Sequence, residues 1–193
     1  AVDGDGMVCT ERDWRLRRPR LIYLTPAHQY PLGAVLCMAR RLELIAQAKA
    51  HRCWIVEDDY DSDIGHGNDP IAALLSLDEN APVVYVGTFS KSMFPALRLG
   101  FLVLPAPLVS DAQGPLRSWM RGGHRFEQLA LAAFIERGSF SNHLGRMRRL
   151  YRQRQLALRE ALTAHLPPGC RIGGGRCGMH LTIEIPASID DRA

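Results

Sequence analysis

Residues 84–101 constrain the fold of this chain most, because an apolar run there ends in a polar turn that carries one amine. Val84, Tyr85 and Val86 have the β-branched and aromatic side chains that favour a buried strand. The following turn contains Lys91, and an arginine comes seven positions after it. The pattern predicts a strand that delivers a single amine into a polar pocket. The alternative is a surface turn with one solvated lysine.

Polar side chains near this lysine match the groups that bind phosphate. Thr88 and Ser90 offer short hydroxyls, and Arg98 offers a guanidinium that can bind two phosphate oxygens at once. Lys91 has apolar neighbours in the sequence, and such surroundings favour an amine that reacts as a nucleophile in Schiff-base chemistry. We therefore expect a site with both an amine and a phosphate-binding turn.

Four short apolar runs predict the strands of an α/β fold, and they cover residues 20–25, 53–56, 83–86 and 99–104. A helix predicted from Met38 to His51 separates the first two runs, with Leu42, Ile45 and Ala46 on one face. A strand, a helix and a second strand in this order favour a parallel pair. The sequence thus indicates an α/β fold with buried strands.

Acidic side chains follow the second predicted strand. Five acids occur within residues 57–63, among them Asp58. Carboxylates that pack together at a strand end are costly, and open α/β sheets bind ligands at the carboxyl ends of their strands. A functional site at this end is the interpretation we favour; a hydrophilic loop, helped by the turn preference of Asp and Ser, is the alternative.

Helices dominate the chain after Ala106. The apolar run 126–135 predicts a buried helix, and a basic helix is predicted from Ser141 to His165. A strand over residues 179–185 follows. We expect residues 1–140 to form part of a large domain, and residues 141–193 to begin a smaller α+β domain.

The basic helix carries most of the net charge of +4, with five arginines in residues 146–154. A nucleic-acid-binding patch is one interpretation. Leu144, Met147 and Tyr151 recur at helical spacing, so an amphipathic helix with a solvated basic face is the preferred one.

Composition excludes several classes. No apolar run approaches the length of a membrane span, and no basic segment followed by an apolar one marks a signal peptide at the N-terminus. The five cysteines are scattered and lack C-x-x-C spacing, which predicts reduced thiols in a cytoplasmic protein. Cys177 and His180 lie three positions apart, but two potential ligands make no site, so no metal is expected.

Three segments together resemble the fold-type-I pyridoxal phosphate enzymes of the class I/II aminotransferase family. More closely, they resemble the aminotransferase-like domain of MocR-type GntR regulators. The segments are residues 25–33, 56–62 and 87–100. The resemblance continues through residues 146–162 and 178–181. It implies a PLP-dependent transferase (fold type I) large domain with a mainly parallel sheet, followed by the start of an α+β small domain.

The resemblance assigns a role to each candidate residue in a site for pyridoxal 5'-phosphate. Lys91 would form the Schiff base, Asp58 would bind the pyridine nitrogen, and Tyr60 would bind the ring hydroxyl. The phosphate ligands would be Thr88, Ser90 and Arg98. These residue types suit the cofactor, because its ring needs a protonated nitrogen to withdraw electrons.

Two departures from the family bear on function. Working aminotransferases of this class have an asparagine where this chain has Tyr30. Family members also extend beyond both ends of this sequence, and the regulators carry a winged-helix DNA-binding module at the front, which this chain lacks. The sequence therefore predicts part of a PLP-binding effector domain that responds to an amino compound and pairs as a homodimer.

Two other functions remain open. The main alternative is a catalytic aminotransferase that moves an amino group between an amino acid and a 2-oxo acid. The other is a cofactor-free interaction module, in which replacing Lys91 would change nothing but solubility.

Overall fold

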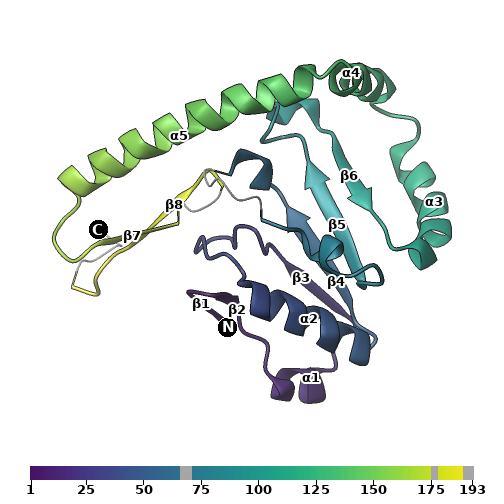
Figure 1. The fold of residues 1–193 in the computed structure, drawn as a ribbon, viewed down its shortest axis with the longest axis horizontal. Helices are drawn as coiled ribbons and strands as arrows, with labels where there is room; N and C mark the ends of the chain where they lie inside the picture. The colour runs from purple at the N-terminus through teal and green to yellow at the C-terminus, as the bar shows by residue number, and fades with distance from the viewer. Residues whose placement is uncertain (66–70, 175–177, 189–193) are drawn as a thin grey trace.

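The computed structural model describes residues 1–65, 71–174 and 178–188 (Figure 1). Its centre is a four-stranded sheet in the order β3-β4-β5-β6. The strands are β3 (Leu21–Leu24), β4 (Trp54–Asp59), β5 (Val83–Thr88) and β6 (Gly100–Val103). β3, β4 and β5 run parallel, and β6 is antiparallel to β5. The predicted α/β fold with a mainly parallel sheet is confirmed.

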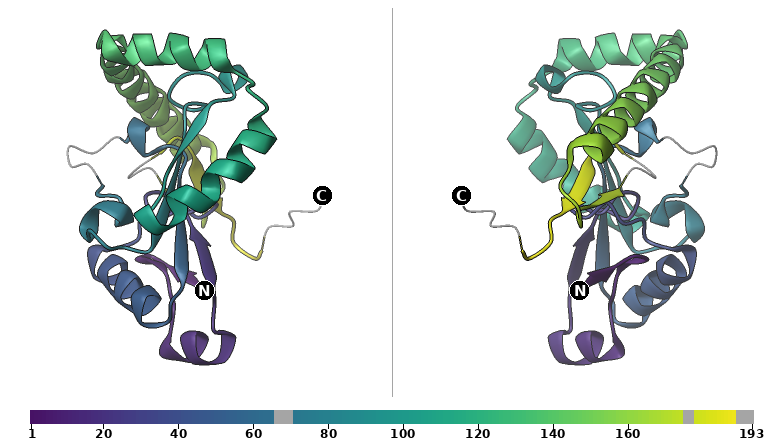
Figure 2. Two further views of the ribbon diagram at one scale, coloured as in Figure 1. Left: turned by 90° about the vertical axis from the view of Figure 1, so that its right-hand side faces the viewer. Right: turned by 90° about the vertical axis from the view of Figure 1, so that its left-hand side faces the viewer.

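Helix α2 (Met38–Ala50) makes the crossover between β3 and β4 and covers one face of the sheet (Figure 2). Ile55 and Val83 are paired in register on this face and are fully buried. They belong to one core cluster of side chains from the sheet, the helix and the flanking segments, which comprises Trp14, Leu24, Leu36, Leu44, Ile45, Ala48, Cys53, Ile55, Leu74, Ala81 and Val83. Burial of this apolar surface holds helix and sheet together.

The buried face of α2 differs from the predicted one. Ile45 is buried as expected, but Leu42 and Ala46 are exposed, and Leu44 and Ala48 take their place. The reason is Arg41, which turns inward and donates to the backbone oxygens of Leu36 and Pro26. Because a charged residue lies on the buried face, the spacing of apolar residues alone predicts the wrong face.

The first residues form two short strands and a helix that the sequence analysis did not predict: β1 (Val2–Asp3), β2 (Gly6–Met7) and α1 (Glu11–Arg17). Thr10 and Asp13 form a capping box at the start of α1. Trp14 points into the core from this helix. The segment contacts both ends of α2, since the backbone oxygen of Asp5 accepts the N–H of Cys37 before its amino end and Trp14 stacks on His51 after its carboxyl end.

The opposite face of the sheet is open. Leu21, Tyr23 and Leu102 are between 45% and 62% exposed there. The expectation that all strands are buried is therefore wrong for β6, each of whose four residues is exposed. Leu102 lies on the uncovered face, and because β6 is an edge strand, no further strand of the described residues shields Phe101 and Val103 on its outer side.

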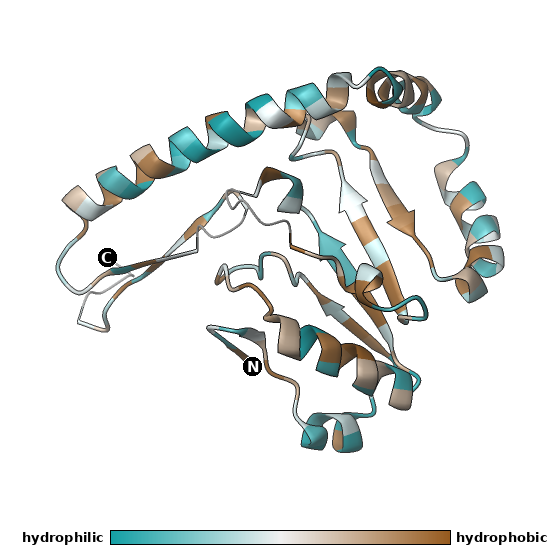
Figure 3. Cartoon of the chain, viewed as in Figure 1, coloured by the Kyte–Doolittle hydropathy of each residue, from teal (hydrophilic) through white to brown (hydrophobic). Residues whose placement is uncertain are grey.

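The helical half runs around the sheet as α3 (Ala106–Met120), α4 (Arg125–Glu136) and α5 (Ser139–His165). The predicted basic helix is confirmed within two residues. The expectation that the apolar run 126–135 is buried is wrong, since Phe126 is 87% exposed and Leu131 is its one buried residue. Figure 3 shows this apolar helix at the outer end of α5. Its length and composition predict the helix, but its burial depends on neighbours that the described residues do not supply.

A short hairpin ends the described chain. It pairs β7 (Arg171–Gly174) with β8 (Leu181–Glu184), which confirms a strand within the predicted segment 179–185. The boundary between residues 140 and 141 stays a prediction. Among the described residues, no helix combines the length and apolar character of a membrane span.

Candidate functional site

The carboxyl ends of β3, β4 and β5 meet at one edge of the sheet, and the predicted site residues gather along it. Asp58 lies opposite Val86 in the ladder, and Thr88 ends the same neighbouring strand two residues later. β6 begins at this edge, because Gly100 pairs with Thr88. Arg98 comes two residues before Gly100 and therefore lies at the same edge. Open α/β sheets bind ligands at this kind of position.

Asp58 is half-buried on the open face of the sheet and binds Tyr23 of β3. The Tyr23 hydroxyl donates a hydrogen bond to Asp58 Oδ2. This bond to the carboxylate, with some burial, raises the pKa of Tyr23 to about 12. Asp58 is thus an oriented acceptor on an otherwise apolar surface, with its neighbour held as a donor.

The turn after β5 is held by its own hydroxyl. The Ser90 N–H donates to Thr88 Oγ1 at 3.1 Å, which fixes the start of the turn. Lys91 is exposed, which differs from the predicted polar pocket around it. The next residue, Ser92, is buried, and its carbonyl accepts a hydrogen bond from His143 Nε2 of α5 at 2.8 Å. The lysine therefore stands on a turn that is anchored on both sides.

Arg98 adopts a left-handed backbone conformation, with φ of 52°, at the end of the short 3-10 helix Pro95–Leu97. Its side chain is exposed. The turn thus carries an exposed guanidinium and an exposed amine on the two sides of one loop.

The three acids at the end of β4 have different contacts. Glu57 is buried on the α2 face, where it accepts the N–H groups of Leu74 and Leu75 at 3.0 and 3.3 Å. Asp59 accepts the Tyr85 hydroxyl at 2.6 Å. Desolvation is the largest cause that raises the pKa of Glu57. These two acids are structural, and Asp58 alone of the three strand acids faces the open side.

Tyr60 and Asp61 follow at the end of β4 and contact the loop after β3. The Tyr60 hydroxyl donates to the carbonyl oxygen of His28 at 2.9 Å. Asp61 Oδ2 lies 2.9 Å from His28 Nδ1, and both side chains are almost completely buried. A neutral or charged imidazole that holds its Nδ1 proton can donate this bond.

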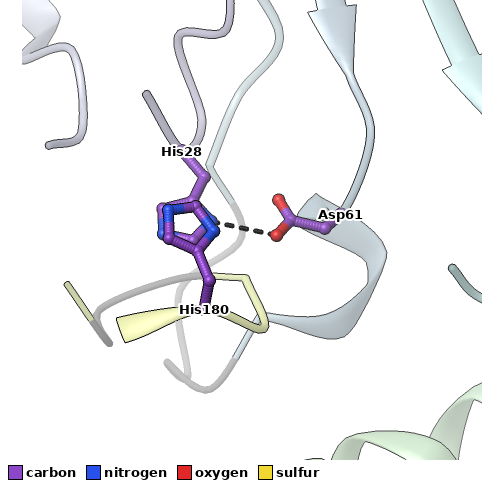
Figure 4. Close-up of side chains that lie close together, drawn as sticks. All are labelled: His28, Asp61 and His180. Carbon is purple, nitrogen blue, oxygen red and sulfur yellow. Dashed lines mark hydrogen bonds and ion pairs between the residues drawn. The ribbon is translucent and has the colours of Figure 1, made fainter. Parts of the chain in front are cut away.

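The hairpin closes over these residues from the far end of the chain. His180 stacks on His28 with ring centroids 3.9 Å apart (Figure 4). It also contacts the ring of Tyr30 edge-on. Burial and the neighbouring His28 lower the pKa of His180. Tyr30 itself is 68% exposed.

Nitrogen and oxygen atoms of His28, Asp61 and His180 lie within 4.8 Å of one another. The stacked rings are poorly arranged for an ion, because a metal lies in the plane of each imidazole that binds it. The other residue considered as a ligand, Cys177, lies outside the described residues.

Sequence reasoning missed Tyr23, His28, Asp61 and His180 as parts of this edge. His28 belonged to the segment that carried the family resemblance, and His180 had been paired with Cys177 as a weak ligand pattern. Tyr23 gave no signal beyond its place in a strand. Its alternation with the buried Leu24 would have put it on the same face as Asp58.

Comparisons with known proteins agree on one family. Residues 14–191 match the family model described as aminotransferase class I and II. The probable rhizopine catabolism regulatory protein MocR of Rhizobium meliloti is 41% identical over 190 residues, covering 94% of this chain and 38% of that protein. The uncharacterized HTH-type transcriptional regulator YhdI of Bacillus subtilis is 40% identical over 177 residues, covering 91% of this chain and 38% of that protein.

Solved structures of aminotransferases share the fold. Kynurenine aminotransferase of Pyrococcus horikoshii has a TM-score of 0.88 at 25% identity, covering 99% of this chain and 49% of that one. LysN, the α-aminoadipate aminotransferase of Thermus thermophilus, has a TM-score of 0.85 at 26% identity, covering 99% and 50%. The chain spans about two fifths of the length of these curated relatives and half of these structures. It belongs to the class I and II aminotransferase family and has its fold-type-I architecture, and its curated relatives include MocR-type transcriptional regulators.

Proposed function

We propose that this chain is part of the effector domain of a MocR-type transcriptional regulator, and that it binds pyridoxal 5'-phosphate through Lys91. The observation that carries the proposal is the common sheet edge of Asp58 and the Lys91 turn. Identity to HTH-type regulators, at 40% and 41%, exceeds the 25% and 26% identity to the two aminotransferases of known structure.

The donor set at this edge fits the cofactor. Lys91 offers an exposed amine to the cofactor's aldehyde, and Asp58 offers a carboxylate to the pyridinium N–H. Tyr60 would turn its single hydroxyl proton from the carbonyl oxygen of His28 to the ring oxygen. Thr88, Ser90 and Arg98 would bind the phosphate through hydroxyls and a guanidinium. When bound, the cofactor supplies an electron-withdrawing ring and an electrophilic carbon that amines attack.

The Tyr23 hydroxyl already donates to Asp58 Oδ2. Asp58 has a second oxygen, so one carboxylate can accept from Tyr23 and from the pyridine nitrogen together. Tyr23 would then orient the carboxylate toward the ring.

An amino compound would act as the effector in this proposal. It would displace Lys91 from the cofactor and free the amine of the turn. The turn is joined to α5 by the bond between Ser92 and His143, so a change at the lysine has a direct path into the helical half. In the intact regulator that change would alter DNA binding by a winged-helix module, and two copies would pair.

A catalytic aminotransferase is the second candidate, favoured by the structural likeness to active enzymes. Tyr30 argues against it. The working enzymes that this chain resembles carry an asparagine at this position, whereas Tyr30 offers no amide and its ring contacts His180 edge-on. Turnover of an amino acid with a 2-oxo acid would favour the enzyme over the regulator.

Titration of the full-length protein on its operator DNA, with and without the cofactor, tests the proposal. We expect the cofactor to change the DNA affinity of the wild type and of Lys49→Ala, but not of Lys91→Ala. Lys49 is the matched control, since it is the only other lysine of this sequence and pairs with Asp78 far from the edge. DNA affinity that is independent of the cofactor in all three proteins would contradict the proposal.

A further inference from the structure

We propose that the buried pair His28 and Asp61 is a positioning device that joins the β7–β8 hairpin to Tyr60. It would fix the Tyr60 phenol for its contact with the cofactor only while the hairpin is docked. The inference rests on the proposed function, because Tyr60 is taken as the partner of the cofactor's ring oxygen.

The pair first fixes Tyr60 from the side of the sheet. Tyr60 donates to the carbonyl of His28 at 2.9 Å, and its oxygen also lies 3.5 Å from Nδ1 of the same imidazole. The two rings are nearly parallel, with centroids 6.1 Å apart. Rotation of the His28 imidazole would leave this backbone carbonyl in place, but it would move Nδ1 and the ring beside the phenol.

Among the described residues, Asp61 makes the shortest contact to a ring nitrogen of His28, and the Tyr60 hydroxyl lies farther from the same nitrogen. Nδ1 bonds Asp61 Oδ2 at 2.9 Å, whereas Nε2 is buried and has no hydrogen-bond partner within residues 1–65, 71–174 and 178–188. The tautomer with hydrogen on Nδ1 gives the carboxylate its donor and leaves Nε2 as a bare acceptor. Because this bond is the shortest to the ring, loss of Asp61 would loosen the orientation of the imidazole.

The hairpin uses the same carboxylate. The Met179 N–H donates to Asp61 Oδ2 at 3.1 Å, so one oxygen serves the imidazole and the hairpin backbone together. His180 then covers the free face of the His28 ring at 3.9 Å. Two further bonds, from His180 Nε2 and from the Thr182 hydroxyl, end on the carbonyl of Pro31. The hairpin is thereby attached to the loop after β3 at several points.

Gly178 allows this approach. A Cβ at this position would lie 1.8 Å from His28 Nδ1 and 2.2 Å from Asp61 Oδ2, and its φ is +70°. No side chain fits there, so the hairpin can dock only where a glycine brings its backbone onto the pair. An ordinary packing contact would leave room for a methyl group on the hairpin. The contact at Gly178 leaves none.

Gly178→Ala in the full-length protein separates the hairpin from the pair without changing the chemistry of either. Gly169→Ala is the matched control, because Gly169 also has a positive φ of +91°, but its Cβ would meet only Pro186, at 3.3 Å. Hydrogen exchange at the Met179 amide, measured without cofactor, reports docking. We expect exchange about tenfold faster or more in Gly178→Ala, the effect of losing a bond to a charged acceptor, and little change in Gly169→Ala.

The second readout is the pH midpoint of the visible absorbance change of the cofactor-loaded protein. A phenol that donates to the ring oxygen favours the anionic form of that oxygen, so its loss raises the midpoint. We expect Gly178→Ala and His28→Phe to raise the midpoint in the same direction as Tyr60→Phe, and Gly169→Ala to leave it unchanged.

Each result decides a separate point. Unchanged Met179 exchange in Gly178→Ala would overturn the docking role of the pair. Faster exchange with an unchanged midpoint would overturn the coupling to Tyr60. A wild type that takes up no cofactor on Lys91 would instead refute the proposed function, while the exchange measurement still decides the docking.

Discussion

Replacing Glu57 with alanine tests whether the acids after β4 are structural or functional. Glu57 is buried and accepts two backbone N–H groups, from Leu74 and Leu75. Alanine removes the acceptor and leaves both donors unsatisfied. An unsatisfied buried donor costs about 1–3 kcal/mol, and Leu75 is only partly buried, so we expect a loss of about 2–4 kcal/mol in the free energy of unfolding.

Glu57→Gln should cost less, about 1–2 kcal/mol, because the amide oxygen still accepts one N–H. It also gives a pH signature. Burial raises the pKa of Glu57 above its ordinary value of 4.5, so the folded state holds this proton more tightly than the unfolded chain. The contribution to stability is therefore full below pH 4.5 and is lost as the pH rises through the folded pKa. Glutamine lacks this ionisation and should gain on the wild type over that window.

Urea denaturation of the full-length protein, followed by tryptophan fluorescence, measures both variants. The buried Trp14 belongs to the same core cluster as Leu74, so its fluorescence reports the unfolding of this core. A loss below about 1 kcal/mol in Glu57→Ala would refute the structural role, since it would mean that the two N–H groups find water or other partners at little cost.

Three further outcomes follow from the same contacts. Asp58→Asn should bring the pKa of Tyr23 down from about 12 toward its ordinary value of 10.0, because it removes the negative acceptor. An ultraviolet pH titration, with Tyr23→Phe to identify the signal of this phenol, measures the change, and an unchanged pKa would exclude the bond. Ile55→Ala should cost about 2–5 kcal/mol by urea denaturation, whereas Leu156→Ala, half exposed on α5, should stay within about 0.5 kcal/mol; equal losses would contradict the assigned core. Docking of the hairpin should weaken as the pH falls below 6.5, since the docked state lowers the pKa of His180 and the undocked state binds the proton more tightly; Met179 exchange that is independent of pH, after correction for the intrinsic rate, would contradict this.

Local sequence patterns predicted the framework of the sheet. The β-branched runs before Asp58 and Lys91 correctly indicated strands, and the helix between the runs 20–25 and 53–56 correctly indicated a parallel pair. These patterns depend on near neighbours in the chain, which the sequence displays directly.

Patterns that depend on distant packing were not predictable. The apolar run of α4 looked buried, yet Phe126 is 87% exposed, since burial depends on what packs against a helix. Arg41 is buried because backbone oxygens of two loops surround it, and no spacing rule shows those loops. The exposure of Lys91 likewise depends on which segments pack beside its turn, and the local sequence does not show them.

The edge residues lie between these extremes. The positions of Asp58 and the Lys91 turn followed from the strand order. The stack of His180 on His28 did not, because it joins segments far apart in the chain: His180 bonds Pro31 across 149 positions. Long-range contacts of this kind need the fold before they can be seen.

Reductive trapping of the cofactor tests whether Lys91 forms the Schiff base. The full-length protein would be mixed with pyridoxal 5'-phosphate, reduced with borohydride, digested and analysed by mass spectrometry. We expect a phosphopyridoxyl group on the peptide that contains Lys91, and none on the peptide that contains Lys49. A label on another lysine in place of Lys91, or no label on any peptide, would contradict this expectation.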